Sequence, residues 1–164
     1  MHSLRIEMLQ RMPIFGAITP QSLEFLLLQA REREVRAHDF FFRQGEQACF
    51  MYVLETGEVS VRKHWQGREF LLRQLGPGDC FGEMALMDLD ERSASVRAES
   101  DCLAIELSPG DLLRLFEHDV EQFALIQMNI GREVCRRLRA TDELLFRAMV
   151  GDLSPSVDSV FQSL

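Results

Sequence analysis

The sequence predicts an α+β fold in which short antiparallel strands are flanked by N-terminal helices and by one long C-terminal helix. Two patterns carry this prediction. Between residues 33 and 107, extended apolar runs alternate with Gly-containing turn signals, as expected for antiparallel strands. From residue 108 onward, apolar residues recur every three or four positions, which is the spacing of amphipathic helices.

Two short helices are predicted before the strands. Apolar residues at helical spacing indicate a helix over residues 4–11, and Pro13 helps to end it. Thr19 is a suitable N-cap, and Pro20 fits the first position of a second helix of about ten residues. The buried face of this second helix would consist of Leu23, Leu26, Leu27 and Ala30.

The strand region is divided by turn signals that each contain Gly. These signals lie at residues 44–46, 56–58, 66–67 and 76–79, and the third is predicted to be a hairpin tip. The strand-like runs between and around them are Val35 and residues 40–42, 50–54, 59–61, 70–75, 96–98 and 102–107.

Two helices are predicted after the strands. Ser108 is a suitable N-cap, with Pro109 at the first helical position and Asp111 three residues after the cap. This helix should end near residue 117. A long helix should then run from about residue 120 to about residue 150.

The stretch from residue 81 to residue 98 contains the residues with chemical potential. Gly82 permits a tight turn into a short helix whose free N–H groups suit an anion. Arg92 offers a fork of donors that matches a phosphate, and Ser93 adds a hydroxyl. An ionised Glu83 only accepts, so beside a bound phosphate it calls for a hydroxyl donor such as ribose. Taken alone, Glu83 and Arg92 could simply form a structural ion pair.

The whole stretch resembles the phosphate-binding cassette of the cyclic nucleotide-binding domain family. Its Glu-Arg-Ser-Ala form is most similar to the bacterial catabolite activator branch. The resemblance extends along the strands through Gly45, Tyr52, Gly57 and Gly78, and it implies that the strands form a jelly-roll-like β-roll. The cassette residues that carry it are Phe81, Gly82, Glu83, Ala85, Leu86, Arg92, Ser93 and Ala94.

The resemblance also implies roles for individual residues. Arg92 would pair with a cyclic phosphate, and Glu83 would hold the ribose 2′-hydroxyl. Ser93 and the backbone at Gly82 and Ala94 would add phosphate contacts. The predicted ligand-binding set is completed by Met84, Ala85, Arg137 and Thr141.

Thr141 has two interpretations. The resemblance places a Thr three residues after Arg-Arg-Leu over the purine, and here this residue is Thr141. Its hydroxyl would favour adenine, whose exocyclic amine can donate to it. Alternatively, a polar residue in an apolar stripe sets the helix register. Asp142 follows where the branch has Ser, so the purine preference and a cross-subunit contact stay open.

An apolar seam on the long helix predicts a dimer. Its first half is expected to pack on the β-roll, and its second half extends beyond what one roll can cover. We therefore expect a parallel two-helix homodimer, as in the catabolite activator branch. The seam consists of Ile126 or Gln127, then Ile130, Val134, Leu138, Thr141, Leu145 and Ala148.

Composition limits the class of protein. A chain of 164 residues fits one domain, and its net charge of −8 argues against an extended nucleic-acid surface. The sequence has no apolar run as long as a membrane span and no signal-peptide core. We expect a cytoplasmic protein that contacts neither DNA nor a membrane. Its four cysteines, Cys49, Cys80, Cys102 and Cys135, should be reduced, and three of the four should be packed in strands.

Catalysis is not expected, because the histidines are scattered and no metal-ligand spacing, P-loop or nucleophile elbow occurs. We expect no cofactor apart from the ligand, cAMP. One cyclic nucleotide-binding domain is predicted over residues 1–150, followed by a tail over 151–164. The domain would contain an N-terminal helical segment (1–32), the β-roll with its cassette (33–107) and C-terminal helices (108–150).

The predicted function is a stand-alone cAMP sensor that signals through protein–protein contact. About 14 residues remain after Val150, too few for a helix-turn-helix domain, so the tail is expected to be disordered or to dock on a partner or on its own β-roll. Three rivals remain. The pocket could bind cGMP or cyclic di-GMP instead. The fold could be a ligand-free scaffold, which a degraded cassette would mark. A cupin-like enzyme would need clustered His and carboxylate ligands.

Overall fold

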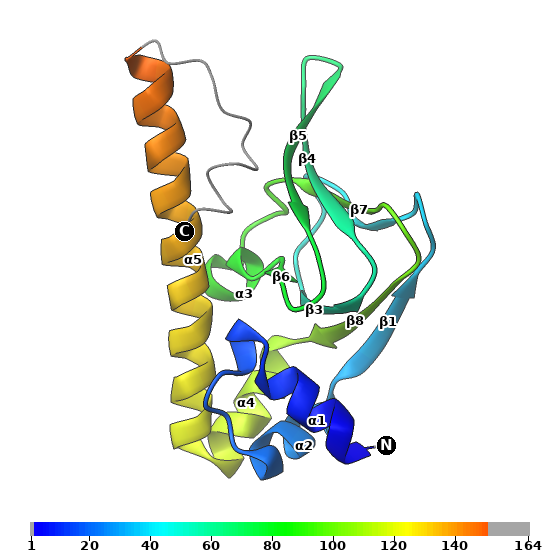
Figure 1. The fold of residues 1–164 in the computed structure, drawn as a ribbon, viewed down its shortest axis with the longest axis vertical. Helices are drawn as coiled ribbons and strands as arrows, with labels where there is room; N and C mark the ends of the chain where they lie inside the picture. Colours follow the sequence, from blue (N-terminus) through cyan, green and yellow to red (C-terminus); the bar gives the residue numbers. More distant parts are fainter. Residues whose placement is uncertain (1, 151–164) are drawn as a thin grey trace.

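A computed structural model describes residues 2–150 and has the predicted α+β architecture. Figure 1 shows a β-roll, a group of short helices at one end, and a long helix that runs along the side of both. The helices are α1 (His2–Gln10), the 3-10 helix η1 (Pro13–Phe15), α2 (Pro20–Gln29), α3 (Met84–Asp88), α4 (Pro109–His118) and α5 (Val120–Met149).

The roll consists of two four-stranded antiparallel sheets. Their strand orders are β1-β8-β3-β6 and β2-β7-β4-β5. The first and last strands therefore lie side by side, with Val35 opposite Cys102, which brings the two ends of the strand region together. The strands are β1 (Arg31–Val35), β2 (Phe40–Phe42), β3 (Met51–Thr56), β4 (Val59–Trp65), β5 (Arg68–Leu75), β6 (Cys80–Phe81), β7 (Ser95–Ala98) and β8 (Cys102–Leu107).

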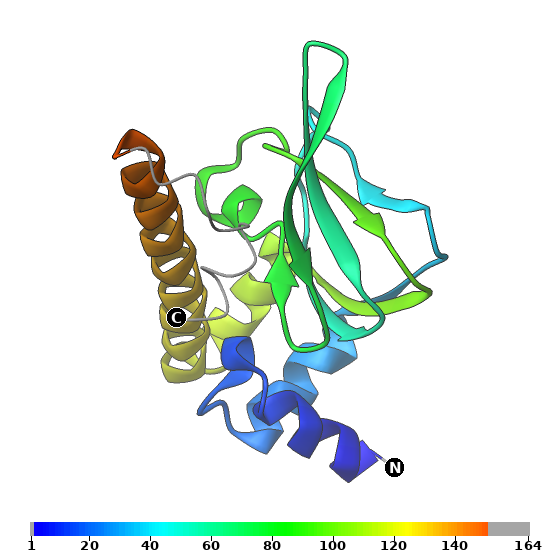
Figure 2. The same ribbon diagram turned by 45° about the horizontal axis from the view of Figure 1, so that its top comes forward.

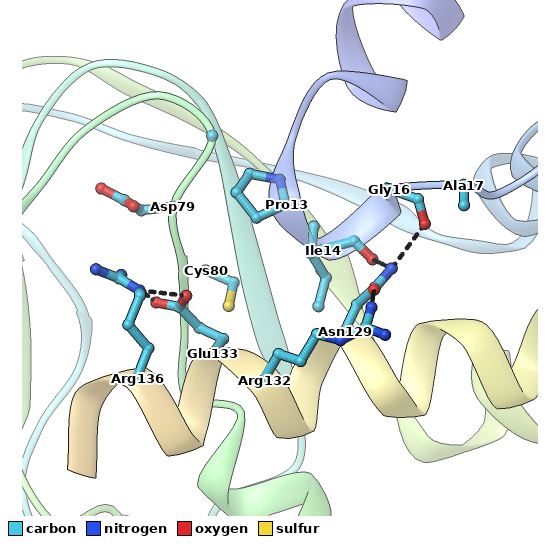
Figure 3. A pocket seen from close by; sticks show the side chains of 11 residues that line it. Pro13, Ile14, Gly16, Ala17, Asp79, Cys80, Asn129, Arg132, Glu133 and Arg136 are labelled. Atoms are coloured by element: carbon cyan, nitrogen blue, oxygen red, sulfur yellow. Dashed lines mark hydrogen bonds and ion pairs between the residues drawn. The ribbon is translucent and has the colours of Figure 1, made fainter. Parts of the chain in front are cut away.

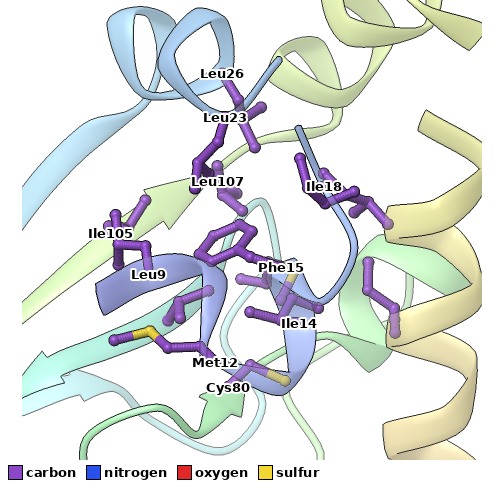
Figure 4. Packing of buried hydrophobic residues seen from close by; sticks show 14 of the residues in the cluster. Leu9, Met12, Ile14, Phe15, Ile18, Leu23, Leu26, Cys80, Ile105 and Leu107 are labelled. Carbon is purple, nitrogen blue, oxygen red and sulfur yellow. The ribbon is translucent and has the colours of Figure 1, made fainter. Parts of the chain in front are cut away.

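Strand β3 is buried on both faces of its sheet. Tyr52 and Leu54 point into the roll, whereas Met51 and Val53 point to the helices. This double burial explains the continuous apolar run around residues 50–54, because a strand with one solvent face would alternate. Figure 4 shows the outer core, where side chains from the helices pack against Ile105 and Leu107 of β8.

The predicted helix caps are present. The Thr19 hydroxyl accepts a hydrogen bond from the Ser22 amide at 3.3 Å, at the start of α2. Ser108 and Asp111 form a capping box at the start of α4. The capping residues explain why both helices begin where the sequence indicated, since a cap satisfies N–H groups that the helix leaves free.

Helix α5 changes character along its length. Ile126 and Ile130 are fully buried in the outer core, against the N-terminal helices as well as β3 and β8. Leu138 and Leu145 lie on the same predicted seam but are 58 % and 60 % exposed. Figures 1 and 2 show the second half of α5 extending past the short helices, on the side where the β4–β5 hairpin projects.

The prediction that three cysteines pack in strands is wrong. All four are free thiols, and only Cys80 and Cys102 are buried in strands. Cys49 is exposed because β3 begins two residues later, at Met51. Within residues 2–150, no helix combines the length and the apolar character that crossing a membrane requires. The predicted tail, residues 151–164, lies outside the described residues.

Candidate functional site

The turn between β6 and α3 depends on Gly82. Its φ of +74° is in the left-handed region that favours glycine. A Cβ atom there would lie 2.6 Å from Arg92 Nη1 and 3.2 Å from the Phe50 carbonyl oxygen. Gly82 is therefore required twice, for the turn and for the space that the Arg92 guanidinium occupies.

Arg92 is a buried cation that is held by a backbone carbonyl and by an aromatic ring. Its Nη2 donates to the Phe50 carbonyl at 2.7 Å, and its guanidinium lies 3.9 Å from the centre of the Phe42 ring. Its Nε is buried and has no hydrogen-bond partner among the described residues. Burial lowers the pKa of this guanidinium, because no carboxylate is bonded to it to offset the loss of water. An anion would provide both the missing acceptor and the missing charge.

Glu83 is a buried carboxylate fixed by α5. Arg137 Nη1 donates to Glu83 Oε1 at 2.6 Å, across 54 residues of sequence. The Glu83 side chain is only 5 % exposed. Because this ion pair uses Oε1, the other oxygen stays available to a donor that enters from the pocket.

Arg92 and Glu83 line one pocket of about 490 Å³ between the cassette, β4, β5 and α5. The structure thus brings together residues far apart in sequence. Of the predicted ligand-binding set, the pocket wall includes Gly82, Glu83, Met84, Arg92, Ser93, Ala94, Arg137 and Thr141. Ala85 lies in α3, but its side chain is outside the described part of the chain.

Thr141 lies on the α5 wall of the pocket. Its hydroxyl donates to the Arg137 carbonyl at 3.0 Å, so the hydroxyl oxygen remains free to accept. Such an acceptor suits an exocyclic amine. Leu138, one turn earlier, lines the same wall. The pocket therefore has a charged end at Arg92 and Glu83, and its α5 wall combines apolar side chains with Arg137 and Thr141.

Comparison with known proteins identifies the family of the chain. Residues 32–119 match the family model described as "Cyclic nucleotide-binding domain". The chain belongs to this family. It is 34 % identical over 131 residues to the cyclic AMP receptor protein of Thermus thermophilus, covering 79 % of this chain and 59 % of that protein. The chain thus spans about three fifths of that relative's length.

Solved structures of the family agree with the fold. The catabolite activator protein of Thermus thermophilus superposes with a TM-score of 0.74 at 32 % identity, covering 84 % of this chain and 63 % of that one. The cyclic di-GMP-responsive regulator CLP of Xanthomonas campestris gives a TM-score of 0.66 at 27 % identity, covering 84 % and 73 %. Related proteins with this fold are thus described with different ligands.

Several pocket residues were not predicted from the sequence. Phe42 and Val61 form an apolar part of the pocket wall. For Val61, the alternation of apolar and polar residues along β4 was the one signal in the sequence. Arg73 of β5 also lines the pocket. Burial, and then the nearby charge of Arg137, lower the pKa of Arg73 to about 10. No local pattern marks Arg73, because its neighbour Arg137 comes from α5.

A second cavity, of about 590 Å³, lies between η1, the β6 turn and α5 (Figure 3). Its polar groups are largely committed to the protein itself. Asn129 Nδ2 donates to the Ile14 and Gly16 carbonyls, and Arg136 is paired with Glu133. The cassette pocket is therefore the better candidate site. Among the described residues, no three His, Cys, Asp or Glu side chains gather as potential metal ligands.

Proposed function

We propose that this protein is a cyclic-nucleotide sensor that binds cAMP and signals through protein–protein contact. One observation carries the proposal: a buried guanidinium with an unused Nε and a buried carboxylate with an available oxygen line the same pocket. A cyclic phosphate next to a ribose hydroxyl satisfies both groups at once. Membership of the cyclic nucleotide-binding domain family supports the same ligand class.

The proposed contacts connect the ligand to α5. Arg92 and the cassette backbone would hold the phosphate, and Glu83 would accept from the ribose 2′-hydroxyl. The adenine amine would donate to Thr141 on α5. A ligand shifts a helix only through contacts that differ between two states, and the contact with Thr141 is of that kind.

A homodimer is the proposed assembly. Leu138, Leu145 and Met149 are 58 %, 60 % and 78 % exposed, and they follow each other on α5 at spacings of seven and four residues. A second copy of the same helix would cover this stripe, as in a two-stranded coiled coil. Because the stripe is next to Thr141, a bound base would lie close to the proposed dimer contact.

Calorimetric titration with cAMP, cGMP and cyclic di-GMP tests the ligand. For Arg92→Leu we expect a loss of cAMP affinity of about 10- to 100-fold, since a charged hydrogen bond contributes about 1.5–3 kcal/mol. The matched control is Arg43→Leu, because Arg43 stacks on Phe40 at 3.8 Å in the same way but lies outside the pocket.

The outcomes separate the rival ligands. Preferential binding of cAMP, lost in Arg92→Leu and kept in Arg43→Leu, would support the proposal. Tighter binding of cGMP or cyclic di-GMP would show that cAMP is the wrong ligand but would leave the assignment of the site unchanged. An equal loss in both variants would contradict the assignment of Arg92.

A further inference from the structure

Four side chains of alternating charge connect α5 to the cassette. In order they are Arg136, Glu133, Arg137 and Glu83. Arg136 Nη2 lies 2.8 Å from Glu133 Oε1, and Arg137 Nε lies 2.7 Å from the same oxygen. Arg137 Nη1 then lies 2.6 Å from Glu83 Oε1. Figure 3 shows the first pair, with Glu133 and Arg136 side by side on α5.

Arg137 is fully engaged within the protein. Its third contact is a hydrogen bond from Nη2 to the Cys80 carbonyl. With Nε on Glu133, Nη1 on Glu83 and Nη2 on the backbone, its planar fork is held in one orientation. Arg137 lines the pocket wall, but these three contacts are all within the protein, so its role in this geometry is to fix Glu83.

Glu133 supplies the charge that keeps Arg137 in place. Its side chain is 11 % exposed, and that of Arg137 is 12 % exposed, so water screens the pair weakly. The other charged side chains near Arg137 include the cations Arg73 and Arg136. Without Glu133, Glu83 would be the one remaining carboxylate bonded to Arg137 among the described residues. The positive charges of Arg73 and Arg136 would then repel the Arg137 guanidinium.

We propose that Glu133 is a positioning residue for the nucleotide site. It holds Arg137, and Arg137 orients the Glu83 oxygen that would receive the ribose 2′-hydroxyl. The inference rests on the proposed function. Glu133 lines the second cavity rather than the nucleotide pocket, so it acts on the ligand through Arg137 and does not touch it.

The test compares cAMP with 2′-deoxy-cAMP, which lacks the hydroxyl in question. We expect the wild type to prefer cAMP by about tenfold or more, since Glu83 accepts a charged hydrogen bond. In Glu133→Ala the cAMP affinity should fall about tenfold, while the affinity for 2′-deoxy-cAMP changes little. Glu133→Gln keeps an acceptor oxygen and should recover part of the preference. Glu83→Ala is the reference for complete loss, because this variant should bind cAMP and 2′-deoxy-cAMP equally well.

The matched control is Glu143→Ala. Glu143 pairs with Arg147 at 2.8 Å with the same i, i+4 spacing on α5, but it lies outside both cavities. It should keep the full preference for cAMP. Thermal unfolding of each variant verifies that it is folded.

The results distinguish the inference from the proposed function. If the wild type binds no cyclic nucleotide, the proposed function fails and the inference fails with it. If the wild type prefers cAMP and Glu133→Ala weakens both ligands equally, the residue is merely structural and only the inference is overturned.

Discussion

The two halves of α5 have the same apolar spacing but differ in what covers it. In the first half, Ile126 and Ile130 are fully buried by the chain's own outer core. In the second half, Leu138, Leu145 and Met149 are exposed. An amphipathic pattern therefore shows that an apolar stripe tends to be buried against other residues, and it does not show whether those residues belong to the same chain. The first half stabilises the fold, and the second half is available for function.

The largest expected effect is on the buried half. Ile130→Ala should lower the free energy of unfolding by about 2–4 kcal/mol, because it leaves a cavity in a packed core. Leu138→Ala, the comparable truncation in the exposed half, should change it by about 0.5 kcal/mol or less when measured on the monomer. Urea denaturation at low protein concentration gives both values. Equal losses would show that the two halves do not differ as described.

The next effect concerns assembly. Leu138→Asp combined with Leu145→Asp should convert a dimer into a monomer, because four carboxylates would meet across the helix contact. Sedimentation or light scattering over a range of concentrations measures the mass. Leu28→Asp is the control, since Leu28 is 77 % exposed and belongs to α2, which lies at the opposite end of the molecule from the second half of α5 (Figure 1). A dimer that survives the double substitution would place the contact elsewhere.

The smallest effect is a pH dependence at the junction of the two halves. Although burial alone would raise the pKa of Glu133, the hydrogen bond from Arg136 and the charge of Arg137 lower it below the ordinary 4.5. Its stabilising contribution is therefore present above pH 4.5 and is lost as the pH falls through the lowered value. Glu133→Gln should reduce the loss of stability on acidification in this range. Thermal unfolding between pH 3 and pH 6 measures it, and superimposable pH profiles would contradict it.

The local parts of the site were predictable from the sequence. Gly82, Glu83, Arg92 and Ser93 lie within one short stretch, whose resemblance to the phosphate-binding cassette singled them out, and all four line one pocket in the structure. The caps of α2 and α4 were equally local. Each of these features depends on residues within about a dozen positions of one another.

The remaining features depend on contacts that spacing does not encode. Arg137 was in the predicted set, but its bond to Glu83 spans 54 residues and its partner Glu133 carried no signal. Arg73 has a lowered pKa because α5 brings Arg137 near it. The apolar spacing of α5 is the same in both halves, so the expectation of a covered first half and an exposed second half came from the size of the roll and not from the spacing.

The close approach at Gly82 has a consequence for protein engineering. The Arg92 guanidinium occupies the space that a side chain at residue 82 would fill, and it is anchored on the Phe50 carbonyl. Transplanting residues 81–94 alone into another scaffold would keep the longer bond from Arg92 to the Gly82 carbonyl, at 3.3 Å, but would remove the shorter one to the Phe50 carbonyl. A functional graft has to include Phe50 and the aromatic platform of Phe42 as well. The transferable unit is thus a small three-dimensional module assembled from three separate segments, and it is larger than the linear motif suggests.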